Sequence, residues 1–392
     1  MFTTAIPLVS IILVAVAAVA ALVANFYGMR AYSRAASFEN PPLPGEGDRM
    51  PRATVIVFNQ SNDEMLLDTL ADIKAQDYPD FNIVVVCDGT AEHAEMISEM
   101  ISDRFEGVYV TFVQPGSHNL SRRKLATTIG VKAADGEIVV TTVANVSIPS
   151  TEWLRSLMAP FCGEQGRHID VSLGLSRMRF REMRGPLKWY RQFDAILTDA
   201  LWIGYAAAGK PYRGDGYNLA FRRQVFFDHK GYSKTINLHN GDDDLFIHEI
   251  SNGVNTRVVV SDDSVLETCW NESANRVWSM RKERYSFTSR WLPHAPFVRS
   301  HVMMALQWIV PACSVCGALA GLPGIYPACA AAVVLLVFWG MEIFHYRRLA
   351  ARLGAVRLWW GVVPFWLWRP FGDMLFRYDH RNSRKKNYTW QR

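Results

Sequence analysis

Three consecutive carboxylates, Asp242, Asp243 and Asp244, stand where an apolar helical run begins in the segment GDDDLFIHEI (241–250). An N-cap requires only one acidic side chain, and adjacent carboxylates repel one another, so we expect one of the three to have a raised pKa. A carboxylate whose pKa is raised can act as a general base. A metal cluster, or acids that merely favour the positive end of a helix, would give the same pattern.

Cations gather in a second segment, HNLSRRKLATT (118–128), where Arg122, Arg123 and Lys124 are consecutive at the expected start of a helix. Cations at a helix N-terminus oppose the helix dipole, so they need another reason to be there. A bound diphosphate is one such reason, and a solvated run of charge is the simpler alternative.

A third segment, WSMRKERY (278–285), places Arg281 and Arg284 three residues apart and therefore on one face of a helix. Lys282 and Tyr285 lie close to that face. Such a basic and aromatic face can clamp an anion or lie against lipid head groups.

Two further positions suit contact with a ligand. Asp88 ends a β-branched run and precedes Gly89, so its carboxylate can accept a hydrogen bond from a base or a ribose, or simply complete a turn. The segment RGDGYNLAFRR (213–223) is a loop bent by Gly214 and Gly216. Such a loop lets a ligand approach the backbone closely, although a plain loop has the same sequence pattern.

Alternating strands and helices are expected to position these residues, because β-branched runs predict the strands and helical periodicity predicts the helices. The predicted strands are 53–58, 82–89, 108–113 and one that starts at Ile138, and the predicted helices are 62–75, 91–104 and 121–134. This alternation predicts an α/β fold with a mostly parallel sheet, whose ligands bind at the carboxyl ends of the strands. Asp88 and the turn Val143–Asn145 fall at those ends.

Long apolar stretches predict three transmembrane helices in this chain of 392 residues, of which 49% are hydrophobic. About 20 apolar residues cross a bilayer core, and the stretches at 5–24, 302–320 and 326–345 are of that order. Basic residues follow the first and the last stretch, so the positive-inside rule places the segment between the first two spans in the cytoplasm. The segment LWWGVVPFWLW (358–368) is too short to span, and its tryptophans suit the membrane interface.

Five segments follow from these patterns. They are a transmembrane anchor at 1–29, a linker at 30–50, the α/β domain at 51–300, a transmembrane hairpin at 301–346, and an interfacial aromatic segment with a basic tail at 347–392. The net charge of +5 includes the tail sequence RNSRKK (381–386), which favours anionic membrane lipids. We expect no nucleic-acid partner, since no basic stripe lies in a recognisable binding module, and the six cysteines show neither zinc spacing nor a disulfide framework.

In their order along the chain, these segments resemble a membrane-anchored family 2 glycosyltransferase of the GT-A fold, of the bacterial type with a C-terminal transmembrane hairpin. QDYPDFNIVVVCDGT is similar to the helix-ending turn and uracil-binding strand of that family, and SRRKLATT to the segment where a lysine approaches the donor diphosphate. GKPYRGDGYNLAFRR is similar to the acceptor loop, NGDDDLFIHEI to the motif of the catalytic base, and RKERY stands where Q-x-x-R-W is usual.

The resemblance implies an inverting transfer of a sugar from a nucleotide-diphosphate sugar to a glycan or lipid-linked envelope acceptor, at the cytoplasmic face of the inner membrane. It implies that the base is one of Asp242, Asp243 and Asp244, because the spacing can be aligned with the family motif in two ways. We expect Asp243 to be the base and Asp242 or Asp244 to be the neighbour that raises its pKa. The residues implied to bind the nucleotide sugar are Asp88, Arg123, Lys124, Asn145, Arg281 and Arg284, and those implied to bind the acceptor are Gly214, Gly216 and Asn218. Three spans are too few for a polymer channel, so we expect addition of a single sugar.

One departure from the family pattern concerns the metal. The family holds a divalent cation with a D-x-D pair after the strand that starts at Ile138, and here Val143, Ala144 and Asn145 stand there. Because Mg²⁺ and Mn²⁺ favour carboxylates, we expect no metal cofactor or a weakly bound Mg²⁺ or Mn²⁺. Arg281, in place of the usual Gln, adds a positive charge that can do part of the metal's work on the leaving diphosphate.

A catalytically inactive homologue is the alternative to an enzyme. Such a protein would serve as a membrane scaffold or bind partner transferases, and the missing metal pair favours it. The acidic triplet, the acceptor loop and the paired arginines argue against it, since a scaffold has no use for them.

Overall fold

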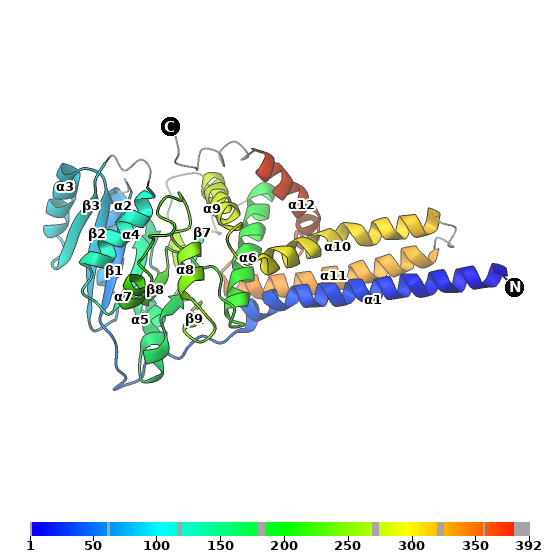
Figure 1. The fold of residues 1–392 in the computed structure, drawn as a ribbon, viewed down its shortest axis with the longest axis horizontal. Coiled ribbons are helices and arrows are strands. Elements are labelled where there is room, and N and C mark those ends of the chain that lie inside the picture. Colours follow the sequence, from blue (N-terminus) through cyan, green and yellow to red (C-terminus); the bar gives the residue numbers. More distant parts are fainter. Residues whose placement is uncertain are drawn as a thin grey trace. The chain divides into compact units, whose positions relative to one another are not determined.

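The structure is a computed structural model, and it describes residues 2–60, 63–115, 120–178, 185–268, 274–319, 325–355 and 357–379. Contacts within the chain divide it into two compact units. The larger unit contains the β-sheets and the helices around them, and the smaller unit is helical (Figure 1).

A seven-stranded sheet with the strand order β3-β2-β1-β4-β8-β6-β9 forms the centre of the larger unit. The four strands β1 to β4 run parallel to one another, whereas β8 is antiparallel to both of its neighbours, β4 and β6. The strands are β1 (Ala53–Asn59), β2 (Phe81–Asp88), β3 (Val108–Val113), β4 (Ile138–Val143), β6 (Val171–Leu173), β8 (Leu219–Arg222) and β9 (Thr256–Val258).

The chain reverses its direction of travel across the sheet between β1 and β4, since β2 and β3 lie on one side of β1 and β4 lies on the other. The crossovers are α2 (Asp63–Lys74), α3 (Ala91–Ser102) and α4 (Arg122–Ala133). Ligands of such sheets bind at this switch point, outside the carboxyl ends of the strands. The predicted strands and helices of this half are confirmed, and all residues of β1 are buried, as expected for a strand covered on both faces.

The remaining elements of the larger unit surround the second half of the sheet. A small sheet has the order β5-β10-β7 and consists of β5 (Val146–Ser147), β7 (Ser176–Met178) and β10 (Leu266–Thr268). The helices are α5 (Trp153–Met158), α7 (Arg223–Asp228), α8 (Asp244–Ile250) and α9 (Ala274–Thr288), with 3-10 turns at Ala159–Phe161 and Gln165–His168. The acidic triplet therefore lies at the start of α8, and the paired arginines lie on α9, as predicted.

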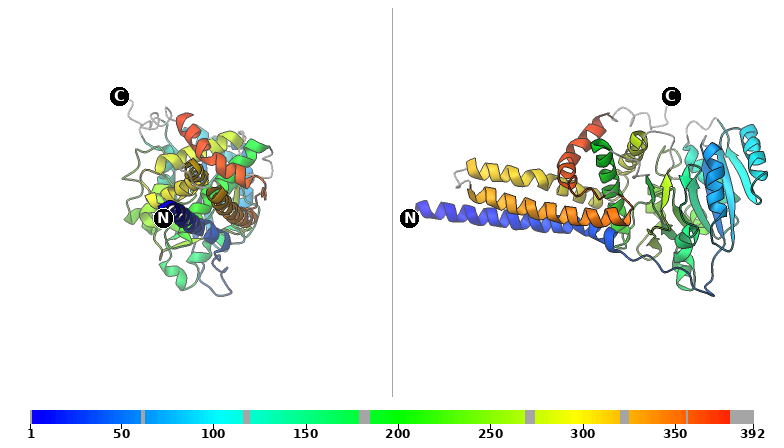
Figure 2. Two further views of the ribbon diagram at one scale, coloured as in Figure 1. Left: turned by 90° about the vertical axis from the view of Figure 1, so that its right-hand side faces the viewer. Right: turned by 180° about the vertical axis from the view of Figure 1, so that it is seen from behind.

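Three long helices run side by side in the smaller unit (Figure 2). They are α1 (Phe2–Ser37), α10 (His294–Leu319) and α11 (Ile325–Arg352). Their segments Ile11–Ser37, His294–Gly317 and Tyr326–Arg352 are long and apolar enough to cross a membrane, with mean hydropathies of 2.3, 1.2 and 2.0. The apolar helices predicted from the sequence are therefore present, and the direction in which they cross stays a prediction.

Two more helices belong to the smaller unit, α12 (Val362–Asp379) and most of α6 (Pro186–Ala206). The ring of Phe193 on α6 packs 5.3 Å from Tyr346 and 5.6 Å from Phe365, and Asp194 accepts a hydrogen bond of 2.9 Å from Arg369 Nε. The predicted α/β segment 51–300 thus contains one helix whose apolar face packs on the C-terminal helices.

The aromatic segment predicted at 358–368 extends further than expected, because α12 continues to Asp379. Large apolar side chains remain exposed on this part of the chain: Trp359, Trp360, Trp368, Phe371 and Tyr378. Exposed tryptophans and tyrosines of this kind favour a membrane–water interface. The basic tail 381–386 lies outside the described residues.

Candidate active site

A cavity of about 590 Å³ opens in the larger unit at the carboxyl ends of β1 and β2. We call it the site cavity. Its described wall contains the charged side chains Asp88, Arg122, Arg123, Asp215, Asp242, Asp243, Arg281, Glu283 and Arg284, together with aromatic side chains that include Phe58, Tyr217 and Tyr285. The wall thus alternates carboxylates with guanidinium groups.

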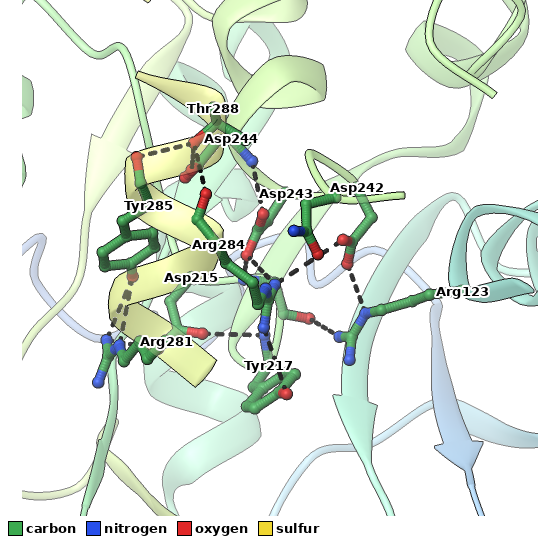
Figure 3. A network of polar contacts seen from close by, with 12 residues as sticks. Arg123, Asp215, Tyr217, Asp242, Asp243, Asp244, Arg281, Arg284, Tyr285 and Thr288 are labelled. Atoms are coloured by element: carbon green, nitrogen blue, oxygen red, sulfur yellow. Dashed lines mark hydrogen bonds and ion pairs between the residues drawn. The ribbon is translucent and has the colours of Figure 1, made fainter. Parts of the chain in front are cut away.

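Two members of the acidic triplet face the site cavity. Asp242 Oδ2 lies 2.5 Å from Arg123 Nε, and Asp243 Oδ2 accepts a hydrogen bond of 2.6 Å from Arg284 Nη2. Figure 3 shows Arg284 next to both carboxylates, with its Nη2 atom 3.8 Å from Asp242. Burial alone would raise the pKa of Asp242, but the neighbouring cations, Arg123 first, outweigh it and hold this pKa below its ordinary value.

The third member of the triplet, Asp244, lies behind the cavity wall and is 1% exposed. Its Oδ1 atom lies 3.0 Å from Arg213 Nε, and its Oδ2 atom accepts a hydrogen bond of 2.6 Å from the hydroxyl of Thr288 on α9. Burial raises the pKa of Asp244 to about 7, with Asp243 adding to the rise and Arg213 opposing it. A general base must contact the group from which it takes the proton. Because Asp244 lies behind the cavity wall, its raised pKa does not make it the base.

We expect Asp244 to make the stability of the protein depend on pH. Its pKa is higher in the folded chain than the ordinary value of 3.8, so folding favours the protonated form. The stability that this group contributes is fully present below the ordinary pKa of 3.8, is lost as the pH rises from there to about 7, and changes little above that. Between about pH 5 and pH 7, thermal unfolding of the wild type should therefore shift to lower temperature more than that of Asp244→Asn.

Calorimetry of the two proteins in the same detergent measures this difference. Asp262→Asn is a matched control, because Asp262 is exposed and its variant should keep the wild-type slope. Equal slopes in the wild type and in Asp244→Asn would contradict the raised pKa.

The two predicted arginines of α9 both reach the site cavity. Arg284 Nη1 donates to the hydroxyl of Tyr217 at 3.3 Å, and Arg281 Nη2 lies 3.5 Å from Asp215 Oδ2. The same Asp215 oxygen accepts bonds of 2.8 Å and 2.5 Å from the backbone amide and the hydroxyl of Ser176. The sequence analysis did not select Asp215 and Tyr217 as site residues. Both lie in the glycine-bent loop, next to the residues Gly214, Gly216 and Asn218 that it did select.

Three arginine–aspartate pairs therefore line one cavity: Arg123 with Asp242, Arg284 with Asp243, and Arg281 with Asp215 (Figure 3). These carboxylates hold the guanidinium groups charged and in place. A guanidinium group matches phosphate oxygens in geometry and in charge. An anion such as a diphosphate can therefore exchange for the carboxylates at these arginines.

Asp88 meets a fourth arginine at the end of β2. Its carboxylate pairs with Arg122, whose Nη atoms also donate to the backbone carbonyls of Val113, at 2.9 Å, and Gln114, at 3.1 Å. Both side chains of the pair lie in the cavity wall. Together they bring a hydrogen-bond acceptor and hydrogen-bond donors to this end of the cavity. Arg122 was noted in the sequence as part of a basic run but not selected as a binding residue.

Several predicted site residues are not brought to the site cavity. The ammonium group of Lys124 is buried against backbone carbonyls, and Asn145 is 6% exposed in its turn. The Asn218 side chain donates to the carbonyls of Leu175 and Ser264, at 2.9 and 2.7 Å, and accepts from the Trp153 indole. These bonds fix the acceptor loop but leave the amide of Asn218 in the interior.

The two selected glycines serve close packing next to the site. A Cβ atom at Gly214 would lie 2.6 Å from Ile247 Cδ1, and one at Gly216 would lie 2.8 Å from Asp243 Cβ. The amide of Gly216 donates to Asp243 at 3.4 Å, and its carbonyl accepts from Arg123 at 3.2 Å. Gly216 therefore allows the loop to touch the acidic triplet, while Gly214 allows it to pack on α8.

The turn Val143–Asn145 does not fit a divalent cation. All three residues are buried, and the carbonyl of Ala144 accepts a hydrogen bond of 2.8 Å from the Thr69 hydroxyl. The turn offers no carboxylate, the group that Mg²⁺ and Mn²⁺ prefer. Within the described ranges, no three His, Cys, Asp or Glu side chains group in a way that could hold a metal ion.

Comparison with known proteins agrees with this architecture. Residues 51–186 match a family described as glycosyltransferase like family 2. The mannosyltransferase PcManGT from Pyrobaculum calidifontis, solved with GDP-Man and Mn²⁺, is 19% identical with a TM-score of 0.51, over 92% of this chain and 99% of its own. The larger unit has the GT-A fold. The predicted fold class is therefore confirmed, whereas the acceptor loop, the acidic triplet and α9 lie beyond the matched residues.

Other solved structures are more distant. TarS 1–349 from S. aureus covers 66% of this chain and 65% of its own, with 16% identity and a TM-score of 0.39. Glucosyl-3-phosphoglycerate synthase from Mycobacterium tuberculosis covers 61% and 80%, with 15% identity and a TM-score of 0.38. No curated protein matches the chain.

Proposed function

We propose that this protein is an inverting glycosyltransferase, which moves a sugar from a nucleotide-diphosphate sugar to a lipid-linked or polysaccharide acceptor of the cell envelope. The observation that carries the proposal is the site cavity, in which the carboxylates of Asp242 and Asp243 face three arginines at the switch point of a GT-A sheet. A general base next to a diphosphate-sized set of cations is what such a transfer needs.

Asp243 is the base in this proposal. The acceptor hydroxyl gives its proton to the carboxylate while its oxygen attacks the anomeric carbon of the donor from the far side. The bond from that carbon to the diphosphate oxygen breaks, and its electron pair leaves with the nucleoside diphosphate. In this structure Arg284 donates a hydrogen bond of 2.6 Å to the carboxylate of Asp243. If Arg284 shifts towards the diphosphate, the carboxylate becomes free to act as the base and the guanidinium group stabilises the leaving group.

Cationic side chains hold the rest of the donor. Arg281 and Arg123 both line the site cavity, and in this proposal both contact the diphosphate. The pair of Asp88 and Arg122 faces the nucleoside. No step is assigned to a metal, because the turn Val143–Asn145 offers no suitable ligand.

We place the protein in the inner membrane with the larger unit in the cytoplasm. Among the described residues, three helices are apolar enough to span a membrane. Arg30 and Arg34 follow the apolar stretch of α1, and Arg347, Arg348 and Arg352 lie in the last turns of α11. The positive-inside rule puts both groups of arginines in the cytoplasm. The exposed tryptophans around α12 would then lie at the membrane surface.

Topology mapping tests this placement. A reporter fused after Met50 or at the C-terminus should report cytoplasm, and a reporter inserted at Gly321 should report the outside. A C-terminal reporter found outside the cytoplasm would contradict the topology with three transmembrane helices.

An inactive scaffold for partner transferases is the second candidate, and the buried, carboxylate-free turn Val143–Asn145 is the observation that favours it. Screening the purified protein against UDP-sugars and GDP-sugars, with and without Mn²⁺, decides between the two. GDP-Man belongs in that set because PcManGT was solved with it. Nucleotide release supports the enzyme, whereas no release and no nucleotide binding with any donor support the scaffold.

A further inference from the structure

Lys124 binds a loop of its own chain. Its ammonium group donates to the backbone carbonyls of Thr235 at 2.6 Å, Leu238 at 3.1 Å and Asn240 at 3.0 Å. The side chain is fully buried, with 0% exposed. An ammonium group has three N–H donors, so these three carbonyls saturate it. A diphosphate would have to displace the loop to reach this cation.

The residue that caps the same helix holds the same loop. The amide of Ser121 donates to the carbonyl of Ile236 at 2.9 Å, and its hydroxyl donates to the carbonyl of His239 at 3.1 Å. Ser121 and Lys124 thus supply donors to nearly every carbonyl of the loop 235–240. The loop lies outside regular helices and strands, so its backbone carbonyls depend largely on such side-chain and backbone donors.

This loop forms part of the site cavity and leads into the acidic triplet. His239 and Asn240 line the cavity, and the chain continues directly into Asp242. The hydroxyl of Tyr232, just before the loop, donates to the carbonyl of Asp242 at 2.9 Å. The position of the loop therefore sets the position of the first carboxylates of the triplet.

We infer that Lys124 is a positioning residue, which fixes the loop 235–240 and the start of the acidic triplet, and that it does not contact the donor diphosphate. The inference also explains the unusual cations at the start of α4. Arg122 and Arg123, which precede Lys124, pair with Asp88 and Asp242. All three cations therefore face partners within the protein, which offsets the unfavourable helix dipole.

Hydrogen exchange tests this inference without any assay of activity. In Lys124→Met, amides of 232–241 should exchange faster by about tenfold or more, because three backbone carbonyls lose their donor. The amides of Thr235 and Leu238, which donate within the loop at 2.9 Å, are the ones to follow. Lys132→Met is the matched control, since Lys132 lies on the same helix but is exposed, and it should leave the loop protected. Unchanged exchange in Lys124→Met would overturn the inference.

Small amines supply a second readout that a general loss of stability would not give. In Lys124→Ala, ethylammonium can enter the space of the missing side chain, and it should restore the protection of 232–241 in a saturable way. Lys124→Arg should restore part of it. If neither Lys124→Met nor Lys124→Ala folds, Ser121→Ala removes a single bond to the loop and should raise exchange of the same segment less. Loop protection that no amine restores in a folded Lys124→Ala protein would count against the inference.

The last readout depends on the proposed function. Binding of UDP and GDP should change by less than about threefold in Lys124→Met, while the rate of sugar transfer falls. If Lys124→Met lost nucleotide binding while its loop stayed protected from hydrogen exchange, Lys124 would instead be a residue that binds the diphosphate. A wild-type protein that binds neither nucleotide would refute the proposed function, and hydrogen exchange would still decide the role of Lys124.

Discussion

Asp243→Asn is expected to lower the rate of sugar transfer by about 10²- to 10⁴-fold, the usual contribution of a general base. Asp243 faces the site cavity, and its Oδ2 atom is held only by Arg284 at 2.6 Å and by the amide of Gly216 at the longer distance of 3.4 Å. The amide of asparagine has the same shape but cannot take the acceptor proton. The lost interaction belongs to the transition state, so kcat falls and donor affinity does not.

Nucleotide affinity gives the prediction a second part. Arg284 pairs with Asp243 in this structure, and the neutral side chain of Asn holds it less strongly. UDP or GDP should therefore bind to Asp243→Asn with an affinity equal to or slightly higher than that of the wild type, measured by calorimetry. Weaker nucleotide binding in this variant would mean that the carboxylate supports the donor site.

The neighbouring acids are the controls. Asp244→Asn should reduce the rate less, since both Asp244 oxygens are bound, at 3.0 and 2.6 Å, behind the wall. Asp242→Asn releases Arg123 and should mainly change donor binding. A wild-type rate in Asp243→Asn would mean that Asp242 is the base. Wild-type rates in all three variants would contradict the proposed mechanism.

The half of the sheet formed by β1 to β4 could be predicted from the sequence. The strands β1 and β4 are buried throughout and β2 over most of its length, so they are continuous apolar runs whose pattern depends on local residues alone. The residue selected at the end of such a strand, Asp88, lies in the cavity wall for the same reason. The helices α8 and α9 were also expected from the local sequence, and the structure places Asp243, Arg281 and Arg284 in the wall of the site cavity.

The partners of these residues could not be predicted, because they come from distant parts of the chain. Lys124 meets carbonyls more than a hundred residues further on, and the sequence shows only a cation at a helix start. Asp244 is covered by Thr288 and Arg213, so the triplet divides into two acids that line the site cavity and one acid behind its wall only after folding. In the same way, the amphipathic pattern of α6 does not reveal that Phe193 packs on the C-terminal helices.

Sugar transfer is expected to survive EDTA and to depend on Arg281. The turn that would carry the metal pair is buried and has no carboxylate, whereas Arg281 reaches the site cavity from α9. Loss of one charge-assisted contact to the diphosphate costs about 1.5–3 kcal/mol, so Arg281→Ala should lower kcat/KM by about 10- to 150-fold. Lys282→Ala removes the adjacent charge on the same helix, away from the described cavity wall, and should have little effect.

Restoring the metal pair should not rescue or improve the enzyme. Val143 and Asn145 are 5% and 6% exposed, so Asp at both positions would bury two new charges and lower stability. The described cavity wall already has five carboxylates against four guanidinium groups, and further negative charge nearby would repel a diphosphate. Rates of the wild type and of Val143→Asp/Asn145→Asp, measured in EDTA and in Mn²⁺, test both points. Wild-type activity that disappears in EDTA and returns with Mn²⁺ would show that Asn145, with an acid such as Asp242, holds a metal after all.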